Sequence, residues 1–169
     1  PIYADGLNAI AAGVKAARKA PDLSACVLTP HPGEYASLAD AFRLREDPFD
    51  PRARESAAYS LAAKLGCVVV LKGAGTVVSD GAALWVCRRG HACMATGGTG
   101  DVLAGVLGGL LAQNAAAGWG VPRFDLACAA VEAHASAGEA WSLSRSAEAG
   151  MLAHELADLI PERLWPSSA

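Results

Sequence analysis

The chain has 169 residues, which is the size of one domain or of a large part of one. Hydrophobic residues make up 53% of it and charged residues only 18%, so the composition is that of a globular protein and excludes a disordered chain. A formal net charge of -3 provides no general basic field, so binding of nucleic acid or of an anionic membrane surface is not expected. Any anionic ligand must therefore be held by local groups.

The five cysteines predict a reducing compartment. Their number is odd and no two of them form a C-x-x-C pair, which argues against a disulfide framework and against a zinc ribbon. We therefore expect free thiols and a cytoplasmic protein. The longest apolar run, residues 102–112, is shorter than the roughly 20 residues that span a bilayer, so no membrane span is expected. The chain begins at Pro1 without a Met or a secretory signal, which suggests a fragment or a processed product.

The N-terminal third predicts a helix, a strand and a second helix. Asp5 is a suitable N-cap for a helix over residues 6–19, which Pro21 ends. Residues 25–29 have the pattern of a short buried strand. A turn-rich loop, residues 30–34, follows this strand, and a short helix is expected from Tyr35.

The middle of the chain predicts one more helix and three strands. Asp50 followed by Pro51 is typical of a helix start, and an apolar stripe then runs to Gly66. Residues 67–71 are an unbroken apolar run, as expected of a parallel strand covered on both faces. Residues 77–87 predict a hairpin, because they surround an Asp-Gly turn signal.

From residue 101 onward the pattern is almost wholly helical. Helices are predicted over residues 101–116, 125–141 and 148–160. Helices alternating with strands, followed by helices, indicate the α/β class with at least one right-handed crossover. The strands are too few for a complete doubly wound sheet, so we expect that N-terminal strands are missing.

The strongest local signal is the glycine-rich stretch TGGTGD at residues 96–101, which leads directly into the first of these helices. Glycines allow a sharp turn and close approach to a ligand, and a helix N-terminus presents unpaired N–H groups to an anion. The stretch has no G-K-[ST] and no G-x-G-x-x-G after a strand, so it is neither a Walker loop nor a dinucleotide fingerprint. The helix is apolar all round, which predicts that it is buried, with close packing at Gly105 and Gly109. The alternative is a plain turn in which Asp101 is an ordinary first-turn acid.

Two further loops follow buried strands and carry ionisable side chains. Lys72 opens the stretch KGAGT at the end of one strand, and His31 opens HPGE at the end of the other. Ligands of open α/β sheets bind at the carboxyl ends of strands, where both residues are expected. The alternatives are a lysine that reaches solvent and a structural or solvent-exposed histidine.

Together these three loops resemble the C-terminal half of the ribokinase-like superfamily. Residues 28–34 (LTPHPGE), 70–76 (VLKGAGT) and 95–105 (ATGGTGDVLAG) are similar to the ADP-dependent NAD(P)H-hydrate dehydratase family, as is ADGLN at residues 4–8. The resemblance covers nearly the whole chain. It implies a ribokinase-like three-layer α/β sandwich that lacks its N-terminal strands, with residues 1–169 forming the C-terminal portion of a single catalytic domain.

The resemblance also implies an activity and a set of site residues. Members of the family repair hydrated NADH and NADPH by phosphorylating the substrate hydroxyl with ADP and eliminating phosphate, which makes them carbon–oxygen lyases. By this resemblance Asp101 is catalytic and orients the hydroxyl, the N–H groups of Gly98, Thr99 and Gly100 form an anion hole, and His31 contacts the substrate. The nucleotide, ADP or ATP, would contact Lys72, Gly73, Ala74, Gly75, Thr76 and Gly100. Mg²⁺ is expected with the nucleotide, although no metal-ligand cluster can be identified in the sequence.

Two stretches depart from the family pattern, and two other functions stay open. The family's G-N-P-G-M is replaced here by GHACM at residues 90–94, and Tyr3 stands where the family has the first Asp of D-A-D. One alternative is a ribokinase-like kinase of a small alcohol, such as a vitamin precursor or sugar, which would release a phosphorylated product. The other is a non-catalytic nucleotide-binding fragment. A homo-oligomer is left open as the assembly.

Overall fold

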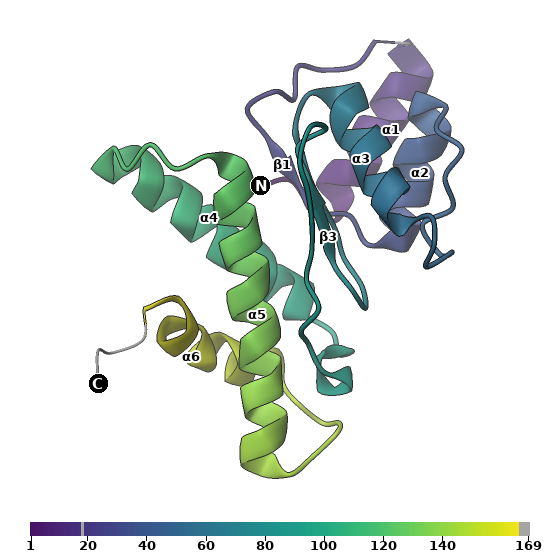
Figure 1. The fold of residues 1–169 in the computed structure, drawn as a ribbon. Coiled ribbons are helices and arrows are strands. Elements are labelled where there is room, and N and C mark those ends of the chain that lie inside the picture. The colour runs from purple at the N-terminus through teal and green to yellow at the C-terminus, as the bar shows by residue number, and fades with distance from the viewer. Residues whose placement is uncertain (18, 166–169) are drawn as a thin grey trace. The chain divides into compact units, whose positions relative to one another are not determined.

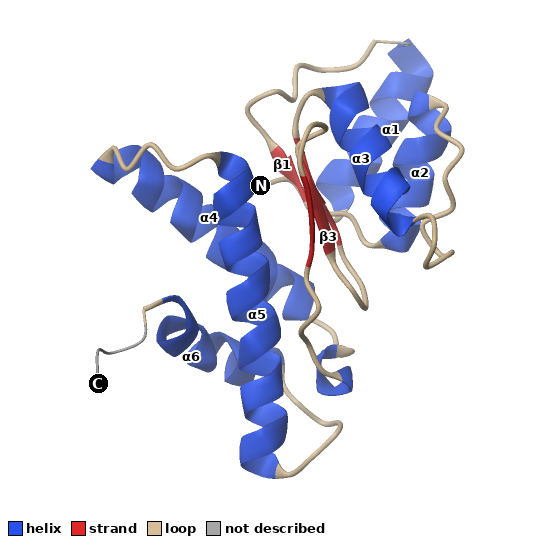
Figure 2. Cartoon of the chain, in the orientation of Figure 1, coloured by secondary structure: helices blue, strands red, loops and turns tan. Residues whose placement is uncertain are grey.

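The structure, a computed structural model, describes residues 1–17 and 19–165. The chain divides into two compact units, Pro1–Val86 and Cys87–Ala169, and each is described by itself. The first unit contains the four strands of the sheet, whereas the second is helical apart from its loops over its described residues, 87–165. Figure 2 shows the strands in red and the helices of both units in blue. The α/β class predicted from the sequence is confirmed.

The first unit is a four-stranded sheet with three α-helices (Figure 1). The strand order is β1-β2-β3-β4; β1 and β2 are parallel, whereas β2–β3 and β3–β4 are antiparallel. The parallel pair requires a crossover, which α2 and α3 provide. Its elements are α1 (Asp5–Ala17), β1 (Val27–Leu28), α2 (Pro32–Phe42), α3 (Arg54–Leu65), β2 (Val68–Leu71), β3 (Val77–Ser79) and β4 (Leu84–Val86).

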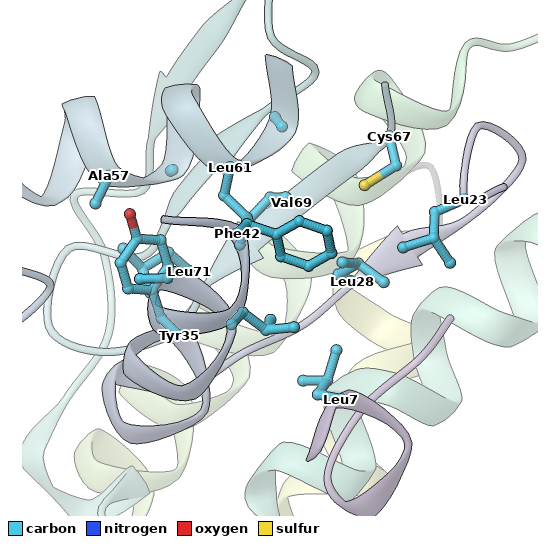
Figure 3. Close-up of a cluster of buried hydrophobic side chains, with 14 of the residues drawn as sticks. Leu7, Leu23, Leu28, Tyr35, Phe42, Ala57, Leu61, Cys67, Val69 and Leu71 are labelled. Atoms are coloured by element: carbon cyan, nitrogen blue, oxygen red, sulfur yellow. The ribbon is translucent and has the colours of Figure 1, made fainter. Parts of the chain in front are cut away.

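Three helices contribute side chains to one apolar core beneath the sheet (Figure 3). Leu7 of α1, Leu61 of α3 and Leu71 of β2 are completely buried, as expected for an apolar helix face packed on a sheet. The stripe predicted before Gly66 is confirmed in part: Ala57 and Leu61 are buried in α3, whereas Leu65 is partly exposed and Ala53 precedes the helix. Gly66 then ends this helix in the left-handed conformation that glycine adopts without strain.

The second unit is a bundle of three long helices. It begins with the short 3₁₀ helix η1 (Ala92–Met94) and continues with α4 (Thr99–Ala117), α5 (Arg123–Arg145) and α6 (Ala153–Leu164). Helix α5 contacts both α4 and α6. A separate buried cluster that includes Trp141, Met151 and Leu156 holds the bundle together. The unit therefore has a hydrophobic core of its own.

Several element boundaries differ from the sequence-based prediction, each for a local reason. Helix α2 begins at Pro32 rather than Tyr35, because His31 and Glu34 cap it. Helix α3 begins at Arg54, because the Asp50 side chain and carbonyl accept N–H bonds in a turn that precedes the helix. Helix α6 begins at Ala153, after a left-handed Gly150. The first helix was expected to reach residue 19; it is described as far as Ala17, and residue 18 lies outside the described residues.

Helix α4 is less buried than its composition predicts. Leu103, Ala104, Leu107 and Leu110 are buried, whereas the opposite side is exposed. A methyl group added at Gly105 or Gly109 would meet no atom within 4 Å, so the close packing predicted at these glycines is wrong. An apolar composition is a poor guide to burial here, since small residues such as glycine and alanine cost little when they face water.

Two further expectations concern membranes and cysteines. In the part of the chain that the structure describes, no helix combines the length and apolar character needed to cross a membrane. As predicted, none of the five cysteines forms a disulfide bond: Cys26, Cys67, Cys87, Cys93 and Cys128.

Candidate active site

His31 caps helix α2 and so lies directly after strand β1. Its Nδ1 accepts the N–H groups of Gly33 at 3.0 Å and Glu34 at 3.2 Å, and Pro32 occupies the first helical position. Because Nδ1 is an acceptor, the proton of the neutral ring is on Nε2. The side chain is 57% exposed, so this N–H can donate to a ligand. The sequence placed His31 in a loop, and the structure shows that it also begins a helix.

Glu34 is the buried carboxylate beside His31. Its side chain is only 7% exposed, and its Oε2 accepts the backbone N–H of His31 at 2.6 Å. The same oxygen is 3.6 Å from the Nζ of Lys72. Glu34 therefore links the helix that follows β1 to the residue that follows β2. No role for Glu34 was predicted, although the spacing H-x-x-E is that of a capping box with histidine in the place of serine or threonine.

Lys72 lies where strand β2 ends. Its N–H donates to the carbonyl of Pro30 at 2.8 Å, which joins the chain after β2 to the chain after β1. As predicted, His31 and Lys72 thus follow the carboxyl ends of two buried strands, and these strands are parallel neighbours. Since only 19% of its side chain is exposed, Lys72 is not the solvent-reaching lysine of the alternative interpretation.

The loop after Lys72 turns on two glycines in left-handed conformations. Gly73 has φ +137° and Gly75 has φ +67°, values that other residues rarely adopt. The Thr76 hydroxyl donates to the Gly73 carbonyl at 3.0 Å and closes the loop. Arg54 of α3 donates to two carbonyls at its start, those of Leu71 and Lys72, both at 3.1 Å. Arg54 was not predicted as a site residue, because a lone arginine at a helix start belongs to no recognisable motif.

In the second unit, the glycine-rich stretch ends at the N-terminus of α4. Gly98 is left-handed with φ +91°, and an added Cβ would lie 2.9 Å from the Cβ of Ala153, so a larger residue does not fit. Thr99 donates its hydroxyl to the carbonyls of Met94 and Thr96, both at 3.0 Å. The N–H groups of Asp101 and Val102 donate to the Gly98 carbonyl, and these are the first hydrogen bonds of the helix. The N–H groups of Thr99 and Gly100 precede them and point out of the helix end.

Asp101 lies in the first turn of α4 and is exposed. Its carboxylate shares the positive end of the helix with the N–H groups of Thr99 and Gly100. The structure therefore brings Gly98, Thr99, Gly100 and Asp101 together at one helix end. An anion bound there would be beside a carboxylate able to accept a proton.

Side chains of helix α5 contact the glycine-rich turn and the segment that precedes it. The Nε2 of His134 lies 2.8 Å from the Thr99 carbonyl, which can only accept, so His134 is the donor. Glu139 accepts the N–H of Gly90 at 2.9 Å and pairs with Arg89 at 2.7 Å. The Gly90 N–H and the Arg89 guanidinium hold the pKa of Glu139 below its usual value. These contacts anchor the stretch that leads into the turn.

His91 is the N-cap of η1 and lies in residues 90–94, the segment that departs from the family pattern. It stands where that pattern has Asn, and its Nδ1 accepts the N–H of Cys93 at 3.3 Å as the N-cap of η1. Its Nε2 lies 3.3 Å from the Ser142 hydroxyl of α5. Asparagine and histidine can both supply the acceptor that a helix start needs, so the substitution keeps a capped turn.

Metal ligands do not gather in the described part of the chain. Among these residues no group of three or more His, Cys, Asp or Glu side chains is placed to hold a metal ion.

Comparison with known proteins matches nearly the whole chain. The family model described as NAD(P)H-hydrate dehydratase matches residues 2–162. The ADP-dependent (S)-NAD(P)H-hydrate dehydratase of Neisseria meningitidis is 37% identical over 165 residues, which cover 96% of this chain and 51% of that protein. A bifunctional NAD(P)H-hydrate repair enzyme of Gloeobacter violaceus is 42% identical over 91% of this chain and 27% of its own length. The chain thus spans about half the length, or less, of these curated relatives.

Solved structures of dehydratases and of ribokinase-like proteins are also similar to this chain. The ADP/ATP-dependent NAD(P)H-hydrate dehydratase of Bacillus subtilis, co-crystallised with ATP/Mg²⁺, has a TM-score of 0.68 at 30% identity, over 82% of this chain and 46% of that one. A ribokinase-like superfamily protein of Enterococcus faecalis has a TM-score of 0.71 at 22% identity, over 96% of this chain and 50% of that one. The second match concerns the fold alone. The ribokinase-like fold predicted from the sequence is confirmed.

Proposed function

The chain belongs to the NAD(P)H-hydrate dehydratase family, and we propose that it carries out the ADP-dependent dehydration of hydrated NADH or NADPH. The observation that carries the proposal is the end of α4, where an exposed Asp101 accompanies the outward N–H groups of Thr99 and Gly100. These groups suit a transferring phosphoryl group and the hydroxyl that attacks it. Such a reaction would take place in the cytoplasm, which the free cysteines favour.

The first step of the proposed reaction is phosphoryl transfer. The substrate hydroxyl attacks the β-phosphorus of ADP, the bond from that phosphorus to the bridging oxygen breaks, and AMP leaves. Asp101 accepts the hydroxyl proton as the new phosphorus–oxygen bond forms. Asp101 would act chiefly through its position beside the attacking hydroxyl. Gly98, Thr99 and Gly100 would stabilise the charge on the phosphoryl oxygens.

The second step is elimination. The carbon–oxygen bond breaks with its electron pair going to phosphate, and the neighbouring ring carbon loses a proton, which restores the double bond of the reduced nicotinamide. Phosphate is a far better leaving group than hydroxide. Phosphorylation of the hydroxyl by ADP therefore makes the elimination easier. His31, with an exposed ring that carries its proton on Nε2, would hold the substrate by a hydrogen bond.

We propose that the loop of residues 72–76 in the first unit binds phosphate groups of the nucleotide. The two left-handed glycines, the largely covered ammonium of Lys72 and the carbonyls tied back by Arg54 support phosphate binding there. Mg²⁺, when bound with the nucleotide, would neutralise phosphate charge. Among the described residues no ready-made set of ligands fits it, so we derive no step through the metal.

Replacing Asp101 by Asn tests the proposal. Asn keeps the shape of the side chain but cannot take the proton, so kcat for hydrate dehydration should fall by about 10²-fold to 10⁴-fold. The dissociation constant of ADP should change little or decrease, because a negative charge near the phosphates is removed. Both quantities are measured on the same preparations, by absorbance of the reduced nicotinamide and by calorimetry.

Asp125→Asn is the matched control, because Asp125 is also an exposed acid in the first turn of a helix, α5. Both variants lose the same helix-dipole stabilisation, roughly 0.3 to 1 kcal/mol, but only Asp101 should affect turnover. If Asp101→Asn retains a rate within about threefold of the parent, the catalytic assignment is rejected.

A further inference from the structure

Arg54 connects three segments of the first unit. It is the first residue of α3, and its Nη1 donates to the carbonyl of Pro48 at 3.2 Å. Its Nη2 donates to Leu71 and Lys72, both at 3.1 Å, and lies 3.5 Å from the carbonyl of Gly75. The guanidinium thus joins the turn before α3 to the end of β2 and to both sides of the glycine loop.

The charge of Arg54 is not neutralised by a carboxylate. Among the described residues no ion pair involves Arg54, and its buried Nε has no hydrogen-bond partner. Burial lowers the pKa of the guanidinium from its usual value, yet an arginine stays protonated in proteins. Within the described residues, the hydrogen-bond partners of the guanidinium are thus backbone carbonyls, and its positive charge lies against the loop of residues 72–76. An anion bound to the loop of residues 72–76 would balance the positive charge of Arg54.

The loop is also shaped around this side chain. An added Cβ on Gly73 would lie 3.0 Å from Nη2, 3.2 Å from Nη1 and 3.4 Å from Cζ of Arg54, so the flat guanidinium occupies the space that a side chain would need. The carbonyls of Lys72 and Gly75, which would repel a phosphate, are occupied by the guanidinium. A planar fork with several donors can hold carbonyls from both sides of a turn, and a lysine ammonium cannot match this geometry.

We propose that Arg54 is a positioning residue for the nucleotide: it holds the loop of residues 72–76 in its phosphate-binding shape and places a positive charge behind it. This inference rests on the proposed function, because it presumes that ADP binds to that loop. A purely structural Arg54 would stabilise α3 and β2 without influencing ADP affinity.

The test compares Arg54→Met and Arg54→Lys with Arg52→Met, an exposed arginine two residues away. The dissociation constant of ADP is measured by calorimetry. Arg54→Met should raise it by about 10-fold to 100-fold, because both the charge and the hydrogen bonds are lost. Arg54→Lys should recover part of this loss, since it keeps the charge without the fork, and Arg52→Met should leave the constant unchanged.

Hydrogen exchange without nucleotide provides an independent readout. In Arg54→Met the amides of residues 73–76 should exchange at least about tenfold faster, while those of Val69 and Val70 in β2 keep their rates. A folded Arg54→Met or Arg54→Lys that binds ADP within about twofold of the parent overturns the proposal, whatever the exchange rates are. Should Arg54→Met not fold, the Arg54→Lys comparison decides alone. A parent protein that does not bind ADP instead contradicts the proposed function, so the two failures are distinct.

Discussion

At the scale of single residues, Glu34 is the carboxylate that holds the first unit's part of the candidate site together. It accepts the His31 N–H and lies beside Lys72 while almost fully buried. In Glu34→Gln the amide is a weaker acceptor and leaves the Lys72 ammonium without its counterion. We expect a loss of about 1 to 3 kcal/mol in the free energy of unfolding, measured by urea denaturation.

Asp40→Asn is the control for this variant. Asp40 also pairs with a lysine, Lys15 at 2.6 Å, but both side chains are largely exposed, so this pair should contribute far less than the buried one. Equal losses for the two variants would show that Glu34 is not the link described here.

Tyr35 is a second buried polar group, and its hydroxyl has no hydrogen-bond partner in the structure. Burial raises the pKa of this phenol above its usual 10.0, with a smaller contribution from Glu46. The folded protein therefore keeps the proton when the unfolded chain has lost it, and stability must fall as the pH rises above about 10. Tyr35→Phe should remove this part of the pH dependence and should leave stability at pH 7 unchanged or slightly higher.

The measurement is the free energy of unfolding of both proteins between about pH 9 and pH 11. The slope against pH should be shallower in Tyr35→Phe than in the parent. Tyr59→Phe, which changes an exposed tyrosine, should keep the parent slope. Parallel curves for Tyr35→Phe and the parent would contradict the description of Tyr35 as a buried phenol without a partner.

At the scale of elements, the β3–β4 hairpin depends on a close contact with α3. Gly81 in the turn has φ +86°, and an added Cβ would lie 2.7 Å from the backbone of Ala63. Gly66 also has a positive φ, +62°, but a Cβ there would meet nothing within 4 Å. Gly66→Ala should therefore cost only the left-handed conformation, about 1 to 2 kcal/mol, whereas Gly81→Ala must also move the hairpin off the helix.

Thermal and urea unfolding of the two alanine variants check this comparison. Gly81→Ala should be the less stable of the two by at least about 1 kcal/mol. Losses that agree within experimental error would show that the approach of hairpin and helix imposes no constraint.

Most helices and strands could be predicted from the sequence, but their boundaries less well. The existence, type and order of the main elements followed from apolar periodicity and turn residues, and the Asp-Gly pair located the hairpin. Helix starts were less predictable, because several neighbouring side chains can accept the first N–H groups of a helix. Asp50 appeared to be a cap but is used in a turn, whereas His31, a rare cap, begins α2. A strict one-sided stripe identified the buried face of α3, but α4 lacks such a stripe, so its exposed face was missed.

At the scale of the whole molecule, motif residues were easier to find than the residues that support them. Lys72, His31 and the stretch around Asp101 stand out because each combines glycines with a strand or helix end. Arg54 and Glu34 act through contacts between segments distant in sequence, such as the 3.1 Å bond from Arg54 to the Leu71 carbonyl. No local pattern encodes such contacts, so they require the fold.

The proposed reaction can be tested by quantifying its products together. The protein is incubated with hydrated NADH or NADPH and ADP, and AMP, inorganic phosphate and reduced nicotinamide are quantified in the same sample. The account predicts that all three form in equal amounts and that none forms without ADP, because each phosphoryl group transferred is eliminated once. A phosphorylated organic product that persists without new reduced nicotinamide would indicate a kinase, and ADP that binds but is never consumed would indicate a non-catalytic nucleotide-binding protein; either result contradicts the account.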